Sequence, residues 1–251
     1  MKLPVTVVLC LCAVAAAGCG RRESGPGKAG AEAEPAPRAW PQGRSAPLKV
    51  TDQLILAVPL QYELSALHHG EATHALMFTQ SDRAEVQFDF FLPDFSGYTL
   101  ANYRQEFDEH KVEVVYLHAG DPHEAKPDAA GEYPPNLLKR ALQDLFNPDD
   151  REDRYGLRCY RGRSLTDRMA CYGQRDAASR EDILLYVAVP PYAAGVFPVM
   201  QARYFTQRYG GIRIAWRTHV SNLPRWHDID SEIWKLIDAW NVAPTAAAKT
   251  P

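Results

Sequence analysis

The sequence has no excess of charge of one sign, and beyond its first residues it has no long apolar run. Its 251 residues include 28 Lys and Arg against 31 Asp and Glu, a formal net charge of -3. Without a strong positive field there is little to hold a polyphosphate backbone, so a nucleic acid is not expected as a partner. No stretch after the N-terminus reaches the roughly 18 apolar residues of a membrane-spanning helix, so we expect a soluble body.

Familiar catalytic and metal-binding patterns are also missing. The sequence contains no Gly-x-Ser-x-Gly, no phosphate-binding glycine loop and no His-Glu-x-x-His. The single histidine cluster is His68, His69 and His74. Adjacent side chains point apart on a strand and lie far apart on a helix, so His68 and His69 are poorly placed to share one metal ion. We expect no metal and no cofactor.

Two pairs of carboxylates are the remaining candidates for catalysis. Asp89 with Asp94, or Asp228 with Asp230, could serve as a hydrolase dyad in principle. Their spacing distinguishes nothing, and solvated surface charge explains them better. The prediction is therefore that the protein is not an enzyme. A hydrolase whose nucleophile lies outside the recognisable patterns is an alternative.

The N-terminus has the pattern of an export signal. Lys2 precedes an apolar stretch from Leu3 to Val14, and Ala-Ala-Ala-Gly-Cys19 follows. This ending resembles the bacterial lipobox. Residues 1–18 are then a signal peptide, and lipidated Cys19 is the first residue of the mature chain. An ordinary signal peptide that is cut nearby is the alternative.

A lipobox predicts that the mature protein is located on a membrane surface outside the cytoplasm. In this class of lipoproteins a residue other than Asp after the cysteine implies the outer membrane, and Gly20 stands there. The acyl chains on Cys19 would hold the protein on the membrane. We expect a periplasmic protein that is lipid-anchored, with the outer membrane as the expected site.

Cysteine is scarce in the rest of the chain. Two of the five cysteines lie in the expected signal and one is Cys19, which leaves Cys159 and Cys171. Such a pair in an oxidising compartment predicts one disulfide. Residues 155–160 and 169–172 read as two short strands joined by a polar turn, which would set the two cysteines opposite each other. A redox or metal role is disfavoured because no Cys-x-x-Cys is present.

Low-complexity segments flank the predicted folded part. Residues 19–47 contain mostly Gly, Ala, Pro, Glu, Arg and Ser, with Trp40 as the single aromatic residue. We interpret them as the lipid anchor and a flexible tether. Residues 243–251 are similarly simple and are expected to be a loose tail.

The folded part shows a faint internal duplication. Each half reads as a strand hairpin, a turn with proline, an aromatic residue and glycine, a helix, and a strand that returns to the sheet. The predicted fold class is α+β, with two tandem similar halves, each an antiparallel sheet with a packed helix. The halves are residues 48–147, including a connecting helix, and residues 148–242. A helical and acidic connection joins them. Chance similarity between the two stretches is the alternative.

Apolar residues at three- and four-residue steps predict four helices. They cover residues 99–110, 136–146, 197–209 and 226–240. The last has the strongest pattern, with Pro224 near its start. Its tryptophan-rich stripe could bind a partner, but a buried core face is the favoured interpretation.

An acidic stretch lies in the presumed connection between the halves. Asp149, Asp150, Glu152 and Asp153 follow Pro148. They could form a recognition element aimed at a basic cleft of a partner, which would affect association rate and specificity. A solvated linker explains them equally well, and both interpretations can hold.

The C-terminal part carries a resemblance to a known family. Residues 209–241 begin with Tyr209-Gly-Gly-Ile-Arg-Ile-Ala-Trp216 and end with Ala-Trp240-Asn241. Behind a lipobox, they resemble the C-terminal part of lipoprotein immunity proteins that accompany phospholipase effectors of bacterial type VI secretion. The first half of the chain carries nothing that matches this family, and no functional residue transfers to a position here.

The resemblance implies a non-enzymatic inhibitor that is tethered in the periplasm. Its partner would be a cognate effector, a phospholipase whose active-site entrance it blocks. A protein of another class is the alternative, namely an envelope-maintenance or assembly lipoprotein that binds lipid, peptidoglycan or an outer-membrane component. The two hypotheses differ in the identity of the partner.

Overall fold

The computed structural model describes residues 40–64, 84–104, 108–121, 126, 129–130, 145–163, 166–175 and 182–244. Several predictions fall outside these residues. They are the signal peptide, lipidated Cys19, the tether up to residue 39, the cluster of His68, His69 and His74, most of the helix expected at 136–146, and the tail after residue 244.

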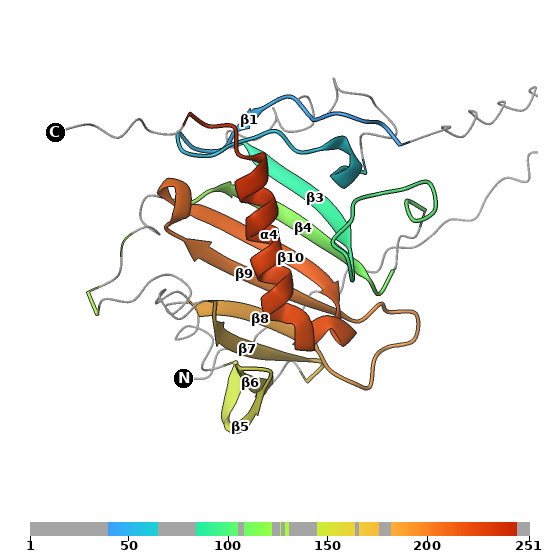
Figure 1. Ribbon diagram of the computed structural model, residues 1–251. Coiled ribbons are helices and arrows are strands. Elements are labelled where there is room, and N and C mark those ends of the chain that lie inside the picture. The colour runs from blue at the N-terminus through green and yellow to red at the C-terminus, as the bar shows by residue number, and fades with distance from the viewer. Residues whose placement is uncertain are drawn as a thin grey trace, which may run out of the picture. The chain divides into compact units, whose positions relative to one another are not determined.

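The described residues form one eight-stranded antiparallel sheet and a smaller two-stranded sheet (Figure 1). The strand order of the large sheet is β3-β4-β10-β9-β8-β7-β6-β5. Its strands are β3 (Glu85–Phe91), β4 (Lys111–Ala119), β5 (Phe146–Arg154), β6 (Leu157–Gly162), β7 (Arg168–Gln174), β8 (Asp182–Ala188), β9 (Val199–Thr206) and β10 (Ile212–His219). The small sheet pairs β1 (Leu48–Lys49) with β2 (Ile55–Leu56).

The predicted fold class is wrong. Strands β5 to β10 form a continuous meander, and β10 then pairs with β4, so both parts of the chain join one sheet. Ile214 on β10 lies opposite Leu117 on β4. The described residues therefore do not form two halves with a separate sheet and helix each, because long-range pairing between β4 and β10 merges them.

One helix, α4 (Trp226–Trp240), lies across one face of the large sheet (Figure 1). The 3₁₀-helix η3 (Val220–Arg225), which contains Pro224, leads into it. Two further short 3₁₀-helices are η1 (Leu60–Tyr62) and η2 (Arg208–Gly210). No helix in the described ranges has the length and apolar character needed to cross a membrane.

The tryptophan-rich stripe of α4 is core, as predicted. Its buried apolar side chains recur at three- and four-residue steps and pack against alternate residues of the strands, which point to the same face of the sheet. The layer between helix and sheet includes Phe88, Phe90, Val114, Leu117, Met169, Leu185, Met200, Ile214, Trp216, Trp226, Ile229, Ile233, Ile237 and Trp240.

The helix expected at residues 197–209 is a strand. Buried residues alternate along β9 at Met200, Ala202 and Tyr204, which is the period of a strand. Pairing with β8 and β10 on both sides satisfies the backbone of β9 and overrides its local helical spacing. The helix expected at 99–110 is also wrong in its described part, where residues 100–104 form a turn in which Tyr103 N–H donates to the Thr99 carbonyl at 3.1 Å.

The segment that begins at Trp40 packs beside β3. The indole N–H of Trp40 donates to the Leu60 carbonyl at 3.0 Å, and its ring stacks on Tyr98 with centroids 5.1 Å apart. Trp40, Phe91 and Tyr98 together form a small buried cluster. Residues that the sequence analysis placed near the end of the tether therefore contact the folded body at the β3 edge.

Candidate functional site

The acidic segment forms β5, one of the two outer strands of the large sheet. A loop or linker is the prediction for this segment, because no apolar alternation indicates a strand, and the structure corrects it. All residues from Pro148 to Asp153 are exposed, and β5 pairs with β6 alone among the described strands. Such an edge leaves the backbone N–H and C=O groups of alternate residues facing outward.

The turn between β5 and β6 fixes the register of this hairpin. Tyr155 and Gly156 both have positive φ, 52° and 75°, which is typical of a two-residue type I′ turn. Arg154 therefore lies opposite Leu157, and Glu152 opposite Cys159. Because hydrogen-bonded and non-hydrogen-bonded pairs alternate, this register turns the backbone groups of Arg151 and Asp153 outward.

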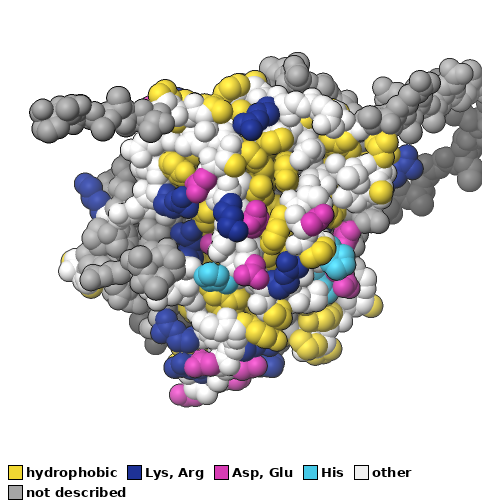
Figure 2. Space-filling model, in the orientation of Figure 1, with side chains coloured by type: hydrophobic (Ala, Val, Ile, Leu, Met, Phe, Trp, Pro, Cys, Tyr) yellow, Lys and Arg dark blue, Asp and Glu magenta, His cyan; other side chains and the backbone are white. Residues whose placement is uncertain are grey.

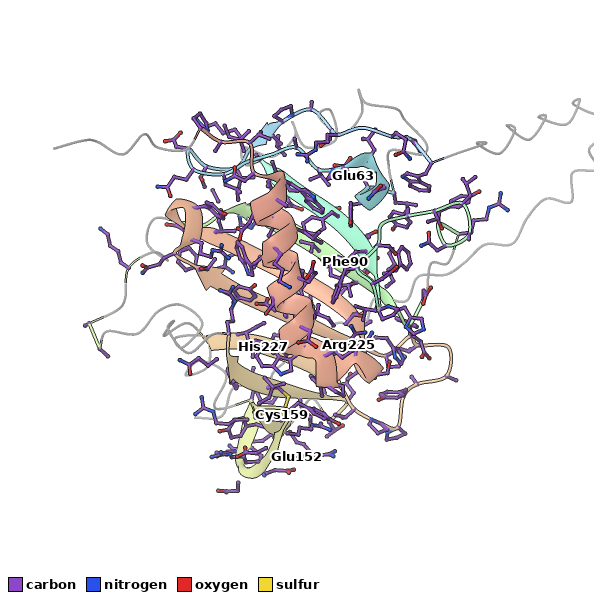
Figure 3. All side chains as sticks on the ribbon, viewed as in Figure 1. Glu63, Phe90, Glu152, Cys159, Arg225 and His227 are labelled. Carbon is purple, nitrogen blue, oxygen red and sulfur yellow. A yellow bond between two sulfur atoms is a disulfide. The ribbon has the colours of Figure 1, made fainter. Side chains whose placement is uncertain are left out.

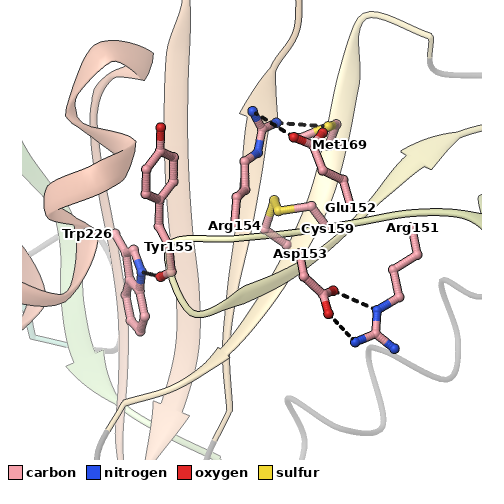
Figure 4. Close-up of a disulfide and its surroundings, with 9 residues drawn as sticks. Arg151, Glu152, Asp153, Arg154, Tyr155, Cys159, Met169 and Trp226 are labelled. Atoms are coloured by element: carbon pink, nitrogen blue, oxygen red, sulfur yellow. Dashed lines mark hydrogen bonds and ion pairs between the residues drawn. A yellow bond between two sulfur atoms is a disulfide. The ribbon is translucent and has the colours of Figure 1, made fainter.

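Two contacts hold the hairpin against the body (Figure 4). Cys159 on β6 and Cys171 on β7 lie directly opposite each other and form a disulfide, as the cysteine count and the predicted strands indicated. At the turn, the indole N–H of Trp226 donates to the Tyr155 carbonyl at 2.8 Å. The first residue of α4 thus anchors the β5–β6 turn, and the disulfide anchors the first half of β6 to β7.

Ion pairs neutralise half of the acidic side chains of β5. The Arg151 guanidinium holds Asp153 through two hydrogen bonds of 2.6 and 2.5 Å, and these bonds lower the pKa of the Asp153 carboxyl. Arg154 lies 3.7 Å from Glu152. Asp149 and Asp150 form no ion pair with any described residue.

The hairpin as a whole is not acidic. Residues 146–163 contain four acidic side chains and five arginines. Figure 2 shows acidic and basic side chains mixed at the lower end of the visible face, where the hairpin lies. In Figure 3 the labelled Glu152 lies on this outer hairpin. Any attraction for a basic partner is therefore local to Asp149 and Asp150.

Asp228 and Asp230 do not form a catalytic pair. Asp230 is buried and accepts hydrogen bonds from the Tyr204 hydroxyl at 2.5 Å and the Trp216 indole at 3.1 Å. Its other oxygen pairs with Arg175 Nε at 2.9 Å. Asp228 is exposed on the other side of α4. The carboxylate of Asp230 is thus fully occupied in a structural network.

Asp89 and Asp94 do not form a catalytic pair either, because they have different partners and different exposure. Asp89 on β3 accepts a hydrogen bond from the Tyr98 hydroxyl and pairs with Lys111 Nζ at 3.2 Å. Burial raises the pKa of the Asp89 carboxyl, and the Lys111 ammonium partly offsets this. Asp94 is exposed and accepts from the Ser96 hydroxyl at 2.9 Å.

Neither of these polar networks can be recognised in the sequence. Lys111 and Arg175 lie far along the chain from the carboxylates of Asp89 and Asp230, and only the sheet and helix bring them together. No spacing in the sequence marks such pairs. Within the described ranges, no group of three His, Cys, Asp or Glu side chains is placed to hold a metal ion.

Comparison with known proteins gives one distant likeness. No family model and no curated protein matches the sequence. Among solved structures, the chain is similar to an immunity protein of the Stenotrophomonas maltophilia type IV secretion system, with a TM-score of 0.46 and 11% identity. The match covers 78% of this chain and 94% of that one. A likeness at this level carries no argument about function.

Proposed function

We propose that this chain is a membrane-anchored immunity protein of the periplasm that binds and inhibits a secreted antibacterial phospholipase effector. The support is the resemblance of residues 209–241 to such lipoproteins, together with the lipobox that ends at Cys19. The observation that carries the binding role is β5, an exposed outer strand on which Asp149 and Asp150 take part in no ion pair with a described residue.

The segment that resembles the lipoprotein immunity proteins forms part of the structural core. Residues 209–241 contain β10, η3 and α4, whose apolar side chains fill the core. Contacts to an effector must then come from elements that face solvent, and the β5–β6 hairpin is such an element. Its turn and its disulfide fix it in place before binding, which lowers the entropy lost on association.

The proposed binding mode is addition of an extended basic segment of the effector to the β5 edge. The outward backbone groups of Arg151 and Asp153 would pair with that segment, as in other complexes formed by strand addition. Asp149 and Asp150 would meet its lysine or arginine side chains. Bound there, the inhibitor blocks the entrance of the phospholipase active site.

The test uses the product of the gene beside this one. The chain from Gly20 onward keeps every described residue and can be titrated with that product by calorimetry. Hydrolysis of phospholipid vesicles is followed in parallel. Tight binding with stoichiometric loss of hydrolysis supports the proposal. Absence of binding, or binding that leaves hydrolysis intact, contradicts it and favours the envelope-lipoprotein alternative.

A further inference from the structure

A pocket of about 340 Å³ lies beside the connection between β8 and β9. Its floor is formed by Tyr186, Ala188 and Gln201 of these strands. Leu185 and Val187 point into the core beneath α4, so Tyr186 and Ala188, which alternate with them, lie on the opposite face of the sheet. The floor of the pocket therefore lies on the face of the sheet opposite α4.

The walls of the pocket are apolar and continue onto the surface. The connection contributes Val189, Pro191, Phe197 and Pro198. At the rim, Tyr192 is 43% exposed and Val196 is 58% exposed. Apolar side chains that stay open to water in one place are typical of a surface that binds a ligand.

Polar groups gather at one side of the pocket. Arg168 and Asp167 both line it, and the Arg168 guanidinium is paired with the Asp167 carboxylate at 3.1 Å. Arg203 is hydrogen-bonded to the Gln201 side chain at 3.0 Å. Burial raises the pKa of the Tyr186 hydroxyl, while Arg203 and Arg168 lower it, so both guanidiniums act on this hydroxyl. No described residue hydrogen-bonds to the hydroxyl of Tyr186, which is left to donate to a ligand.

We propose that this pocket binds the acyl chain of an anionic single-chain amphiphile, with its head group at Tyr186 and Arg168 and with Arg203 nearby. An apolar wall with a few polar groups on one side suits a ligand with the same division. The volume is near the lower end of the roughly 300–1,000 Å³ of small-ligand sites, which favours one chain over a two-chain lipid. The inference is independent of the proposed effector binding.

Two sources share this chemistry, a free fatty acid and an anionic lysophospholipid. Dodecanoate and a lysophosphatidylglycerol with the same chain represent them. Both are titrated by calorimetry, below their critical micelle concentrations, into the chain from Gly20 onward. The tighter of the two identifies the source. Dodecanol, which lacks the charge, should bind at least several-fold more weakly than either.

The affinity should follow the length of the chain. Each methylene added from octanoate to dodecanoate is expected to lower Kd about fourfold while the pocket has room. Ala193 lines the pocket from the exposed connection, so Ala193→Trp should fill it and abolish binding. Arg168→Gln should weaken dodecanoate several-fold and leave dodecanol unchanged.

The matched control is Arg161→Gln. Arg161 is an exposed arginine of β6 that does not line the pocket, and the variant should bind dodecanoate as the unaltered chain does. No measurable binding of any of the anionic probes would overturn the proposal. Binding that survives Ala193→Trp would overturn it as well, because the ligand would then sit elsewhere.

Discussion

Asp230 joins α4 to the sheet through its carboxylate. It accepts from Tyr204 and Trp216 and pairs with Arg175, whose side chain is 8% exposed. Asp230→Ala would break this buried ion pair and remove the acceptor of the Tyr204 hydroxyl and the Trp216 indole, so we expect the free energy of unfolding to fall by about 3–5 kcal/mol. Urea unfolding measures the change. Asp228→Asn, two residues away and exposed, should change it by less than about 0.5 kcal/mol. Equal effects of both substitutions would contradict the role given to Asp230.

Glu63, directly after η1, makes stability depend on pH. Burial raises the pKa of its carboxyl from 4.5 to about 7, and a hydrogen bond with Ser45 partly offsets this. The folded state then binds more protons than the unfolded state between these values, so the free energy of unfolding falls as pH rises from about 4.5 to about 7. Glu63→Gln should flatten this part of the profile, measured by urea unfolding at several pH values. An unchanged slope in the variant would show that another group titrates.

The β6–β7 pair depends on its disulfide for stability. Cys159 and Cys171 close a loop with a sequence separation of 12, and such a loop contributes roughly 3 kcal/mol in the chain-entropy model. Replacing both cysteines by alanine should lower the melting temperature, measured by calorimetry, and leave the far-ultraviolet circular dichroism unchanged. A melting temperature equal to that of the unaltered chain would mean that the bond adds nothing to the folded state.

The β5 edge should govern the rate at which the partner associates. Asp149→Asn with Asp150→Asn removes the two carboxylates that no described ion pair neutralises. We expect slower association at low salt and a smaller effect at high salt, measured by stopped-flow mixing with the effector. The matched control is Glu109→Gln with Asp228→Asn, which removes two exposed charges elsewhere. Equal association rates for the two double variants would show that Asp149 and Asp150 have no special role in binding the effector.

The sequence predicts those helices and strands whose structure is determined by the spacing of neighbouring residues. The stripe from Trp226 to Trp240 predicts α4 because one periodic face is buried. The hairpin of β6 and β7 follows from its two cysteine-bearing segments. In contrast, β9 has helical spacing at Met200 and Tyr204, and its strand structure comes from two neighbouring strands. Residues 147–153 have no apolar alternation, because an outer strand has little to bury.

The arrangement of the whole sheet could not be predicted in the same way. The pairing of β4 with β10 joins segments that lie far apart in the chain, and no local pattern specifies it. The prediction of two similar halves was wrong for this reason. Of the candidate site, the cysteine pair and the acidic residues were identified from sequence. The place of the acidic residues on an outer strand beside the cysteine-bearing hairpin was not, because it depends on the I′ turn at Tyr155 and Gly156.

The attachment point of the tether and the proposed binding strand lie at opposite edges of the large sheet. Trp40, where the described chain begins, packs on Phe91 and Tyr98 beside β3, and β5 is the last strand at the other edge. Eight strands span roughly 30 Å across a sheet. A protein anchored through Cys19 would then carry β5 on the side of the body away from the attachment of the tether, open to an arriving effector.

We expect the lipid anchor on Cys19 to be required for protection of cells but not for binding of the effector. Cys19→Ala should abolish protection of cells, because the protein loses its address, while the purified chain from Gly20 onward still binds the effector. Survival is compared between cells with Cys19→Ala and cells with the unaltered protein at equal expression. Full protection by an exported but unlipidated variant would show that the membrane anchor is dispensable.

Neutralisation of the effector in the periplasm is the property that distinguishes an immunity protein from other lipoproteins. The product of the neighbouring gene is exported into the periplasm of a sensitive bacterium, with and without the full-length protein, and surviving cells are counted. We predict that cells die without the protein, survive with it, and lose protection with Asp149→Asn and Asp150→Asn when expression is low. Equal killing in the presence and absence of the protein, with both proteins folded and exported, would contradict the account.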